Sequence, residues 1–227
     1  MANYNNYSVS RGKGKLYLKS ATPQEGYEEV TYGEGQKTYH KYFDRVEGVL
    51  KYFDTKEAQT KDGKKLQFLE VTFINGEDNN KISVPLKNSK GNYTDEVKSL
   101  VSALNGAEIG ENMTMAVKKS TWEANGKTGD NLNVYLNYVD RKNEDGKGLS
   151  TGFIAFNDIP KATKEEDEDL GITYDWKPVN KFWAQKIKEV KAKFDNKTTP
   201  TVPTATPEQA FEPSTSFPET QHNDLPF

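Results

Sequence analysis

Aromatic and lysine side chains occur together on the polar faces of several stretches of the sequence that alternate with strand periodicity. Rings offer flat π-faces on which bases can stack, and lysines neutralise phosphates, so side chains of these two kinds are what nucleic-acid binding requires. On the strand faces the candidate contacts are Lys51, Phe53, Phe68, Lys118, Trp122 and Tyr135, and the adjoining loops add Lys64, Lys65 and Lys127.

The candidates differ in how well a purely structural role would explain them. Tyr135 is the strongest, because Asn133 and Asn137 flank it on its face and offer it little apolar company. Trp122 stands at a strand end beside a glycine-rich loop, where it could also cap the core. Phe68 lies opposite an apolar row and could instead pack beneath another segment of the chain.

The composition excludes most kinds of catalytic site. The chain has no cysteine and two histidines, His40 and His222, so thiol nucleophiles and thiolate metal sites lack their residues, and metallohydrolase or triad chemistry has almost no imidazole to use. The glycines around Lys13 do not form a phosphate-cradling loop, and the acids of 164–169 are typical of a solvated run. We therefore expect no enzyme activity, no catalytic residues, no metal and no cofactor.

The stretch 66–86 predicts a β-hairpin that positions part of this set. Leu69, Val71 and Phe73 alternate with polar residues, Asn75-Gly76 supplies the turn, and the alternation resumes over 82–86. A preceding strand begins at Arg45, with Val46, Gly48, Leu50 and Tyr52 on one face and Val49, Lys51 and Phe53 on the other. Gly48 predicts a bulge in that strand.

A helix and two further strands follow the hairpin. Thr94 is the predicted N-cap, the apolar stripe is Val97, Leu100, Val101 and Leu104, and Asn105-Gly106 ends the helix. Strands are predicted from Met113 towards Trp122 and from Leu132 to Tyr138. The order of three strands, a helix and two strands resembles that of the OB-fold family, a five-stranded Greek-key barrel that binds oligonucleotides. We therefore expect a mainly β, OB-fold-like barrel with the helix between strands 3 and 4.

Three domains or segments are predicted. Residues 1–42 form an N-terminal extension with one hairpin, and residues 43–194 form the barrel and an amphipathic C-terminal helix over 179–194. Residues 195–227 are rich in proline and threonine and predict a disordered acidic tail. The tail has a net charge of −4, so residues 1–194 have a net charge of +1. A near-neutral body permits nucleic-acid binding only if its cations cluster on one face.

The chain end Asp224-Leu225-Pro226-Phe227 resembles the acidic tip of bacterial and bacteriophage single-stranded DNA-binding proteins. One difference is that Asp224 stands next to Asn223 and not in a run of acids. The resemblance implies binding of single-stranded DNA with little sequence preference in replication, recombination and repair. It also implies that the tip recruits replication proteins such as a polymerase, helicase or primase.

The alternative is a protein-interaction or structural module, such as a replication accessory or virion component, that does not bind nucleic acid.

The sequence has no apolar run of membrane-spanning length and no apolar signal core at its start. We therefore expect a cytoplasmic protein with no membrane partner, in the bacterial host cytoplasm if the source is a bacteriophage, which the Asn/Lys/Tyr-rich composition favours. Self-association is left open.

Overall fold

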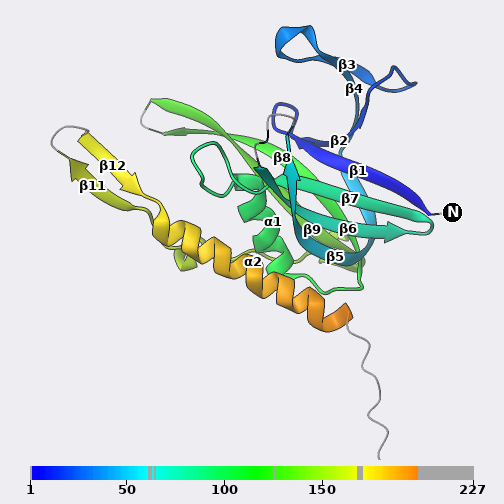
Figure 1. Ribbon diagram of the computed structural model, residues 1–227. Coiled ribbons are helices and arrows are strands. Elements are labelled where there is room, and N and C mark those ends of the chain that lie inside the picture. The colour runs from blue at the N-terminus through cyan, green and yellow to red at the C-terminus, as the bar shows by residue number, and fades with distance from the viewer. Residues whose placement is uncertain (1, 61–62, 64, 125, 168–170, 199–227) are drawn as a thin grey trace, which may run out of the picture.

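The computed structural model describes residues 2–60, 63, 65–124, 126–167 and 171–198. Within these residues the protein is mainly β, with a ten-stranded mixed sheet, a separate two-stranded hairpin and two α-helices (Figure 1). The strands of the large sheet are β1 (Asn3–Ser10), β2 (Lys15–Ser20), β3 (Glu28–Thr31), β4 (Lys37–Phe43), β5 (Arg45–Gln59), β6 (Lys65–Asn75), β7 (Asp78–Pro85), β8 (Asn112–Ala124), β9 (Lys127–Lys142) and β10 (Gly148–Ser150).

The strand order across the sheet is β10-β9-β8-β5-β6-β7-β1-β2-β4-β3. β1 and β2 come from the predicted N-terminal extension, yet they are inner strands of this sheet. β1 pairs in parallel with β7, and the other neighbouring strands pair antiparallel. The predicted element order appears as β5, β6, β7, α1, β8 and β9, but the pairings of the described strands do not close a five-stranded barrel.

The sheet curls far enough for its N-terminal part to reach β8. Gly14, in the turn between β1 and β2, packs so closely on Lys119 that a Cβ at Gly14 would lie 2.7 Å from the Lys119 backbone nitrogen. Gly14 also has φ +63°, which glycine adopts without strain. This turn therefore requires glycine for both its conformation and its contact.

The predicted hairpin over 66–86 is confirmed as β6 and β7. Leu69, Val71 and Phe73 are fully buried, and so are Ile82 and Val84 on the second strand. The strands align Val71 with Ile82, so the two apolar rows lie side by side and form the centre of the core.

β5 departs from the prediction because its bulge lies after Leu50. Leu50 pairs with Phe73 and Tyr52 pairs with Thr72, which leaves Lys51 as the extra residue. An extra residue reverses the face of everything after it. Tyr52 is therefore 56% exposed, and Phe53, predicted to face outward, is 3% exposed. The prediction that Phe53 faces outward, where it could contact nucleic acid, is wrong: its ring centre lies 5.5 Å from that of Phe194 in the core.

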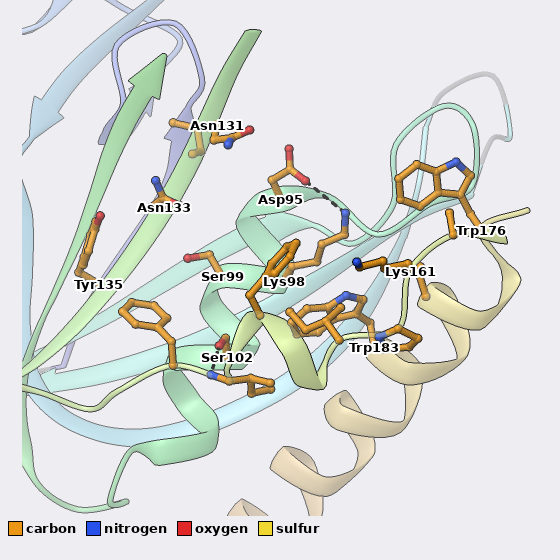
Figure 2. A pocket seen from close by; sticks show the side chains of 18 residues that line it. Asp95, Lys98, Ser99, Ser102, Asn131, Asn133, Tyr135, Lys161, Trp176 and Trp183 are labelled. Carbon is orange, nitrogen blue, oxygen red and sulfur yellow. Dashed lines mark hydrogen bonds and ion pairs between the residues drawn. The ribbon is translucent and has the colours of Figure 1, made fainter. Parts of the chain in front are cut away.

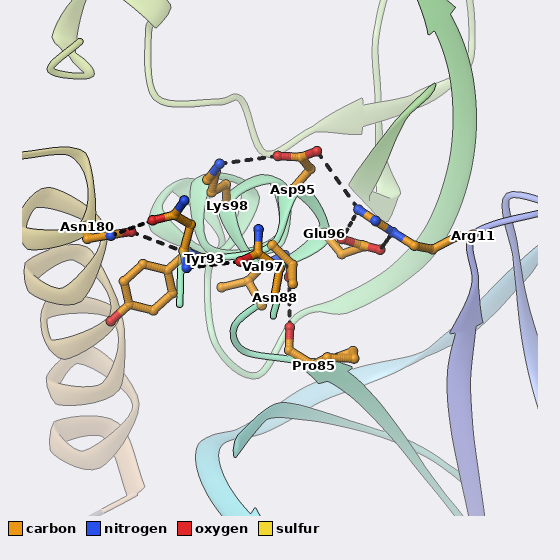
Figure 3. A network of polar contacts seen from close by, with 11 residues as sticks. Arg11, Pro85, Asn88, Tyr93, Asp95, Glu96, Val97, Lys98 and Asn180 are labelled. Atoms are coloured by element: carbon orange, nitrogen blue, oxygen red, sulfur yellow. Dashed lines mark hydrogen bonds and ion pairs between the residues drawn. The ribbon is translucent and has the colours of Figure 1, made fainter. Parts of the chain in front are cut away.

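The first helix, α1 (Asp95–Gly106), follows the predicted capping pattern. The Thr94 hydroxyl accepts a hydrogen bond from the Val97 N–H and donates one to the Pro85 carbonyl, which ties the helix start to the end of β7 (Figure 3). Glu96, in the first turn, accepts two hydrogen bonds from Arg11 of the β1–β2 turn. The predicted apolar stripe of α1 is fully buried.

The chain after β10 crosses α1 before it reaches the second helix. Gly106 is needed at the crossing, because a Cβ there would lie 2.0 Å from the Thr151 carbonyl oxygen. The segment then forms a short 3-10 turn (Phe156–Asp158) and the two-stranded hairpin β11 (Thr163–Asp167) and β12 (Gly171–Asp175).

The second helix, α2 (Lys177–Thr198), runs diagonally below α1 in Figure 1 and contacts α1 and β5. The predicted amphipathic helix over 179–194 is confirmed, since Trp183, Val190 and Phe194 are at most 2% exposed. Asn180 joins it to the loop before α1, because its side-chain amide donates to Asn92 at 2.9 Å (Figure 3). No helix among the described residues is both long and apolar enough to cross a membrane.

Candidate nucleic-acid interface

The outward face of the β8–β9 hairpin brings several of the predicted contact residues together. Met115 and Val117 of β8 and Leu136 of β9 point into the core, so the alternate residues point outward. The register pairs Lys118 with Asn133 and Ala116 with Tyr135, which places Tyr135 diagonally opposite Lys118. The Lys118 ammonium lies 5.6 Å from the centre of the Tyr135 ring. We call this face, formed by Lys118, Trp122, Asn133 and Tyr135, the stacking surface.

Gly129 on the opposite strand has no side chain, which leaves room for the indole of Trp122. Trp122 pairs with Gly129, and a Cβ on Gly129 would lie 2.6 to 2.9 Å from three atoms of the indole. The indole therefore lies over the Gly129 backbone, and the side chain remains 43% exposed. A ring supported on one side and open to solvent on the other is suited to stacking on a base.

The stacking surface adjoins a pocket formed where β9, α1, the segment after β10 and the start of α2 meet (Figure 2). The pocket has a volume of about 650 Å³. We call it the α1–β9 pocket. Tyr135 and Asn133 belong to both features, so the surface and the pocket are continuous. The aromatic residues of the pocket are Tyr135, Phe153, Phe156, Trp176 and Trp183.

The rings around the pocket are only partly covered. Phe153 packs edge-to-face on Tyr135, with ring centres 5.9 Å apart and an interplanar angle of 87°. Phe153 is nevertheless 48% exposed, Phe156 is 77% exposed and Trp176 is 42% exposed. Clusters of exposed large apolar side chains mark binding sites more often than single ones do.

Two lysines contribute positive charge to the pocket. Lys98 of α1 pairs with Asp95 at 3.2 Å and lies 5.9 Å from the Trp176 ring centre, so a neighbouring carboxylate partly compensates its charge. Lys161 points into the space above Trp183 in Figure 2. Among the described residues, neither Lys161 nor Lys118 of the stacking surface pairs with a carboxylate. These two ammonium groups can therefore meet phosphates without first breaking an ion pair.

The opposite face of the hairpin is different in charge. Lys119 pairs with Asp130 at 2.8 Å, and this hydrogen bond lowers the pKa of the Asp130 carboxyl below its ordinary value. Asp130 is thereby held in its charged form beside Lys119. Near the middle of the hairpin, Lys118 on the stacking surface is therefore without the carboxylate partner that Lys119 has on the opposite face.

The two serine hydroxyls of the pocket already join the elements that form it. Ser99 of α1 accepts from the Val134 N–H at 2.7 Å and donates to the Val134 carbonyl at 3.2 Å. Ser102 accepts from the Ile154 N–H at 2.6 Å. These bonds fix β9 and the segment after β10 against the helix, so the walls of the pocket are held in position before any ligand arrives.

The other predicted contacts lie on the β5–β6 hairpin or cannot be placed. Phe68 is half-buried, directly opposite Lys56, and the carboxylates Asp54 and Glu70 occupy neighbouring positions on its face. Lys51 is exposed at the bulge. Lys65 is exposed and pairs with Glu57 at 2.9 Å.

Three predictions concern residues whose side chains the structure does not describe. Lys64 and the chain end Asp224–Phe227 lie outside the described residues, and Lys127 is described only as the first residue of β9.

Sequence reasoning missed the residues that come to the pocket from outside the strands. Phe153 and Phe156 stood in a stretch without periodicity, and Trp176 and Lys161 flank the β11–β12 hairpin. The available signal was the presence of two phenylalanines in a glycine- and asparagine-rich segment, where rings have no regular core to enter. Comparison of the chain with models of protein families and with curated proteins found no match.

Proposed function

We propose that this protein binds single-stranded DNA with little sequence preference, during replication, recombination and repair. The observation that carries the proposal is the row formed by Trp122, Lys118 and Tyr135, which alternates supported rings with an unpaired cation and continues into the α1–β9 pocket. Stacking contributes about 1–3 kcal/mol per base and tolerates any sequence, because every base has a π-face. We also propose that the element order from β5 to β9 is a variant of the OB-fold arrangement.

The chain end would provide a second function on the same protein. Asp224–Phe227, at the end of a proline-rich acidic segment, would bind a polymerase, helicase or primase, as the resemblance to the tips of single-stranded DNA-binding proteins implies. A terminal ring can fill an apolar pocket on a partner while the adjacent carboxylates meet basic groups.

Fluorescence provides a direct test, because the chain has three tryptophans and all of them lie at the proposed site: Trp122 on the stacking surface, and Trp176 and Trp183 in the pocket. Addition of oligo(dT) should quench the emission, and the logarithm of the binding constant should fall linearly with the logarithm of salt concentration. A protein whose emission does not respond to oligo(dT) at low salt would rule out the proposal.

Removal of residues 199–227 tests the role of the tail and leaves α2 intact. These residues have a net charge of −4, so their removal leaves a chain of net charge +1. We expect DNA binding to be preserved or strengthened, because the acids no longer compete with phosphates, and binding to replication proteins to be lost. Weaker DNA binding by the shortened chain would contradict the competition.

The alternative, a protein-interaction module, has one observation in its favour. Ile172 and Tyr174 share one face of β12 and are 58% and 57% exposed. Substitution of both by serine separates the two functions: a protein-interaction module would lose its partner, whereas DNA binding at the stacking surface would persist.

A further inference from the structure

Trp183 carries a hydrogen-bond donor for which the folded chain supplies no acceptor. The residue lies in the second turn of α2 and is 2% exposed. Its indole N–H finds no partner among the described residues. Buried polar groups are nearly always hydrogen-bonded, because water no longer compensates them after folding, and an exception calls for an explanation.

The donor belongs to the α1–β9 pocket. Trp183 lines the pocket, and Figure 2 shows its indole below Lys98 and Lys161. The pocket volume of about 650 Å³ lies within the ~300–1,000 Å³ range of small-molecule sites. The serine hydroxyls of the pocket are occupied by backbone groups, whereas the indole N–H has no acceptor among the described residues; a ligand reaches it once the side chains that cover it in the free chain move aside.

The chemistry of the walls narrows the class of ligand. Phe153, Phe156 and Trp176 offer flat apolar surfaces, which suit a planar ring. The indole N–H requires that this ring carry an acceptor, which an apolar amino-acid side chain lacks. Lys161 has no carboxylate partner among the described residues and stands where a group attached to the ring could carry negative charge. A planar ring with acceptors, joined to a phosphate, is a nucleotide.

We propose that the α1–β9 pocket holds one unstacked base of the bound single strand, with a carbonyl oxygen or ring nitrogen of the base accepting the Trp183 N–H. This inference rests on the proposed function, since the strand reaches the pocket along the stacking surface. Tyr135 and Asn133 belong to both features and would guide the strand from the hairpin into the pocket. Lys98 and Lys161 would contact the flanking phosphates. The Asp95 carboxylate that also lines the pocket is compensated by Lys98 at 3.2 Å and Arg11 at 3.9 Å.

Nuclear magnetic resonance of the full chain tests the contact directly, because the three indole N–H groups give separate signals that Trp→Phe variants assign. With oligo(dT) bound, the Trp183 signal should move downfield and exchange more slowly with solvent. An abasic deoxyribose-phosphate oligomer of the same length should not move it.

The outcomes distinguish this inference from the proposed function. If oligo(dT) moves the Trp122 signal and leaves that of Trp183 in place, the protein binds DNA and the pocket holds no base, which overturns the inference alone. If oligo(dT) moves neither signal and quenches no emission, the proposed function fails. If a peptide of residues 216–227 moves the Trp183 signal and oligo(dT) does not, the pocket docks the chain end, and the inference is again overturned.

A variant adds an affinity measurement. Trp183→Phe keeps an aromatic ring and removes the N–H, and it should weaken oligo(dT) binding about 3- to 10-fold, as expected for the loss of one hydrogen bond. Tyr4→Phe is the matched control, because it also removes one polar hydrogen from an aromatic side chain, but Tyr4 lies on β1, does not line the pocket and is 74% exposed; its affinity should stay within twofold. Equal affinities of Trp183→Phe and the unmodified chain would overturn the inference. If Trp183→Phe does not fold, the signals of the unmodified chain still decide the matter.

Discussion

The stacking surface and the β2–β4 end of the sheet both carry aromatic rings beside lysines, but the rings have different partners. At the β2–β4 end, His40 is 3% exposed and stacks on Tyr17, with ring centres 4.1 Å apart. The hydroxyls of Tyr32 and Tyr42 lie 3.1 and 3.4 Å from its two ring nitrogens. We call these four residues the tyrosine cluster. The polar atoms of these rings contact one another, and the Lys13 ammonium lies 4.0 Å from the centre of the Tyr42 ring.

The lysines of the two regions differ in the same way. Lys13 and Lys37, near the tyrosine cluster, pair with Glu28 and Glu29. Lys118 of the stacking surface has no such partner among the described residues and lies 5.6 Å from the centre of the partly exposed Tyr135 ring. The same residue types therefore serve the fold in one region and remain available to a ligand in the other. Composition alone does not separate the two cases, and the contacts do.

The largest expected effect separates the two regions by a pair of tyrosine substitutions. Tyr135→Ala should reduce the affinity for oligo(dT) about 5- to 150-fold, which corresponds to the 1–3 kcal/mol of one stacked base. Its thermal unfolding should change little, because the ring lies on the outward face of β9 and is only partly buried. Fluorescence titration at fixed salt measures the first quantity and circular dichroism the second.

Tyr17→Ala is the counterpart in the tyrosine cluster. It removes the ring that covers His40 and should lower the unfolding temperature while the folded variant keeps its DNA affinity. The comparison would break down if the folded Tyr17→Ala protein lost as much affinity as Tyr135→Ala, or if Tyr135→Ala were the variant that unfolds.

The stacking surface could be predicted from sequence because its information is local. Lys118 and Trp122 are four positions apart in one strand, and Tyr135 lies between the buried Val134 and Leu136 in the next strand, so the alternation within each strand places all three on the outward face. The same holds for the β6–β7 hairpin and for the cap of α1, where each signal lies within a few residues.

The failures involve contacts between distant parts of the chain. Phe53 was assigned to the wrong face because the bulge at Lys51 reverses the alternation, and nothing within β5 itself marks that position. The parallel pairing of β1 with β7 joins residues 75 positions apart, such as Asn3 with Asp78. No short turn connects these two strands, so no local sequence signal predicts their pairing. The pocket was missed for the same reason, since four separate elements supply its walls.

A smaller effect, on salt dependence, compares lysines of the two regions. For single strands, each neutralised phosphate contributes about −0.7 to the slope of log K against log salt. Lys118→Gln and Lys161→Gln should each reduce the magnitude of the slope by about that amount, because both lysines lack a carboxylate partner among the described residues. Lys37→Gln, which breaks a 2.9 Å ion pair with Glu29, should leave the slope unchanged. Equal slopes for all three variants would contradict the claim that Lys118 and Lys161 contact phosphates and Lys37 does not.

The smallest expected effect is a pH dependence confined to the tyrosine cluster. Burial lowers the pKa of His40, and the charges of Lys19 and Lys13 lower it further; Glu28, opposite His40 in the sheet, is already paired with Lys13. The unfolded chain therefore takes up a proton near pH 6.5, before the folded chain does. The contribution of neutral His40 to the free energy of unfolding is fully present above about pH 6.5 and is lost as the pH falls through the folded pKa. Each kcal/mol lost should lower the unfolding temperature by about 2–4 °C. Thermal unfolding of His40→Gln should lack this component, whereas His222→Gln, which changes the only other histidine, should keep it. The affinity of His40→Gln for oligo(dT) should equal that of the unmodified chain at pH 7.5, because His40 hydrogen-bonds within the tyrosine cluster and is not part of the stacking surface. An unchanged pH profile in His40→Gln would assign the acid sensitivity to carboxylates and leave His40 without a part in it.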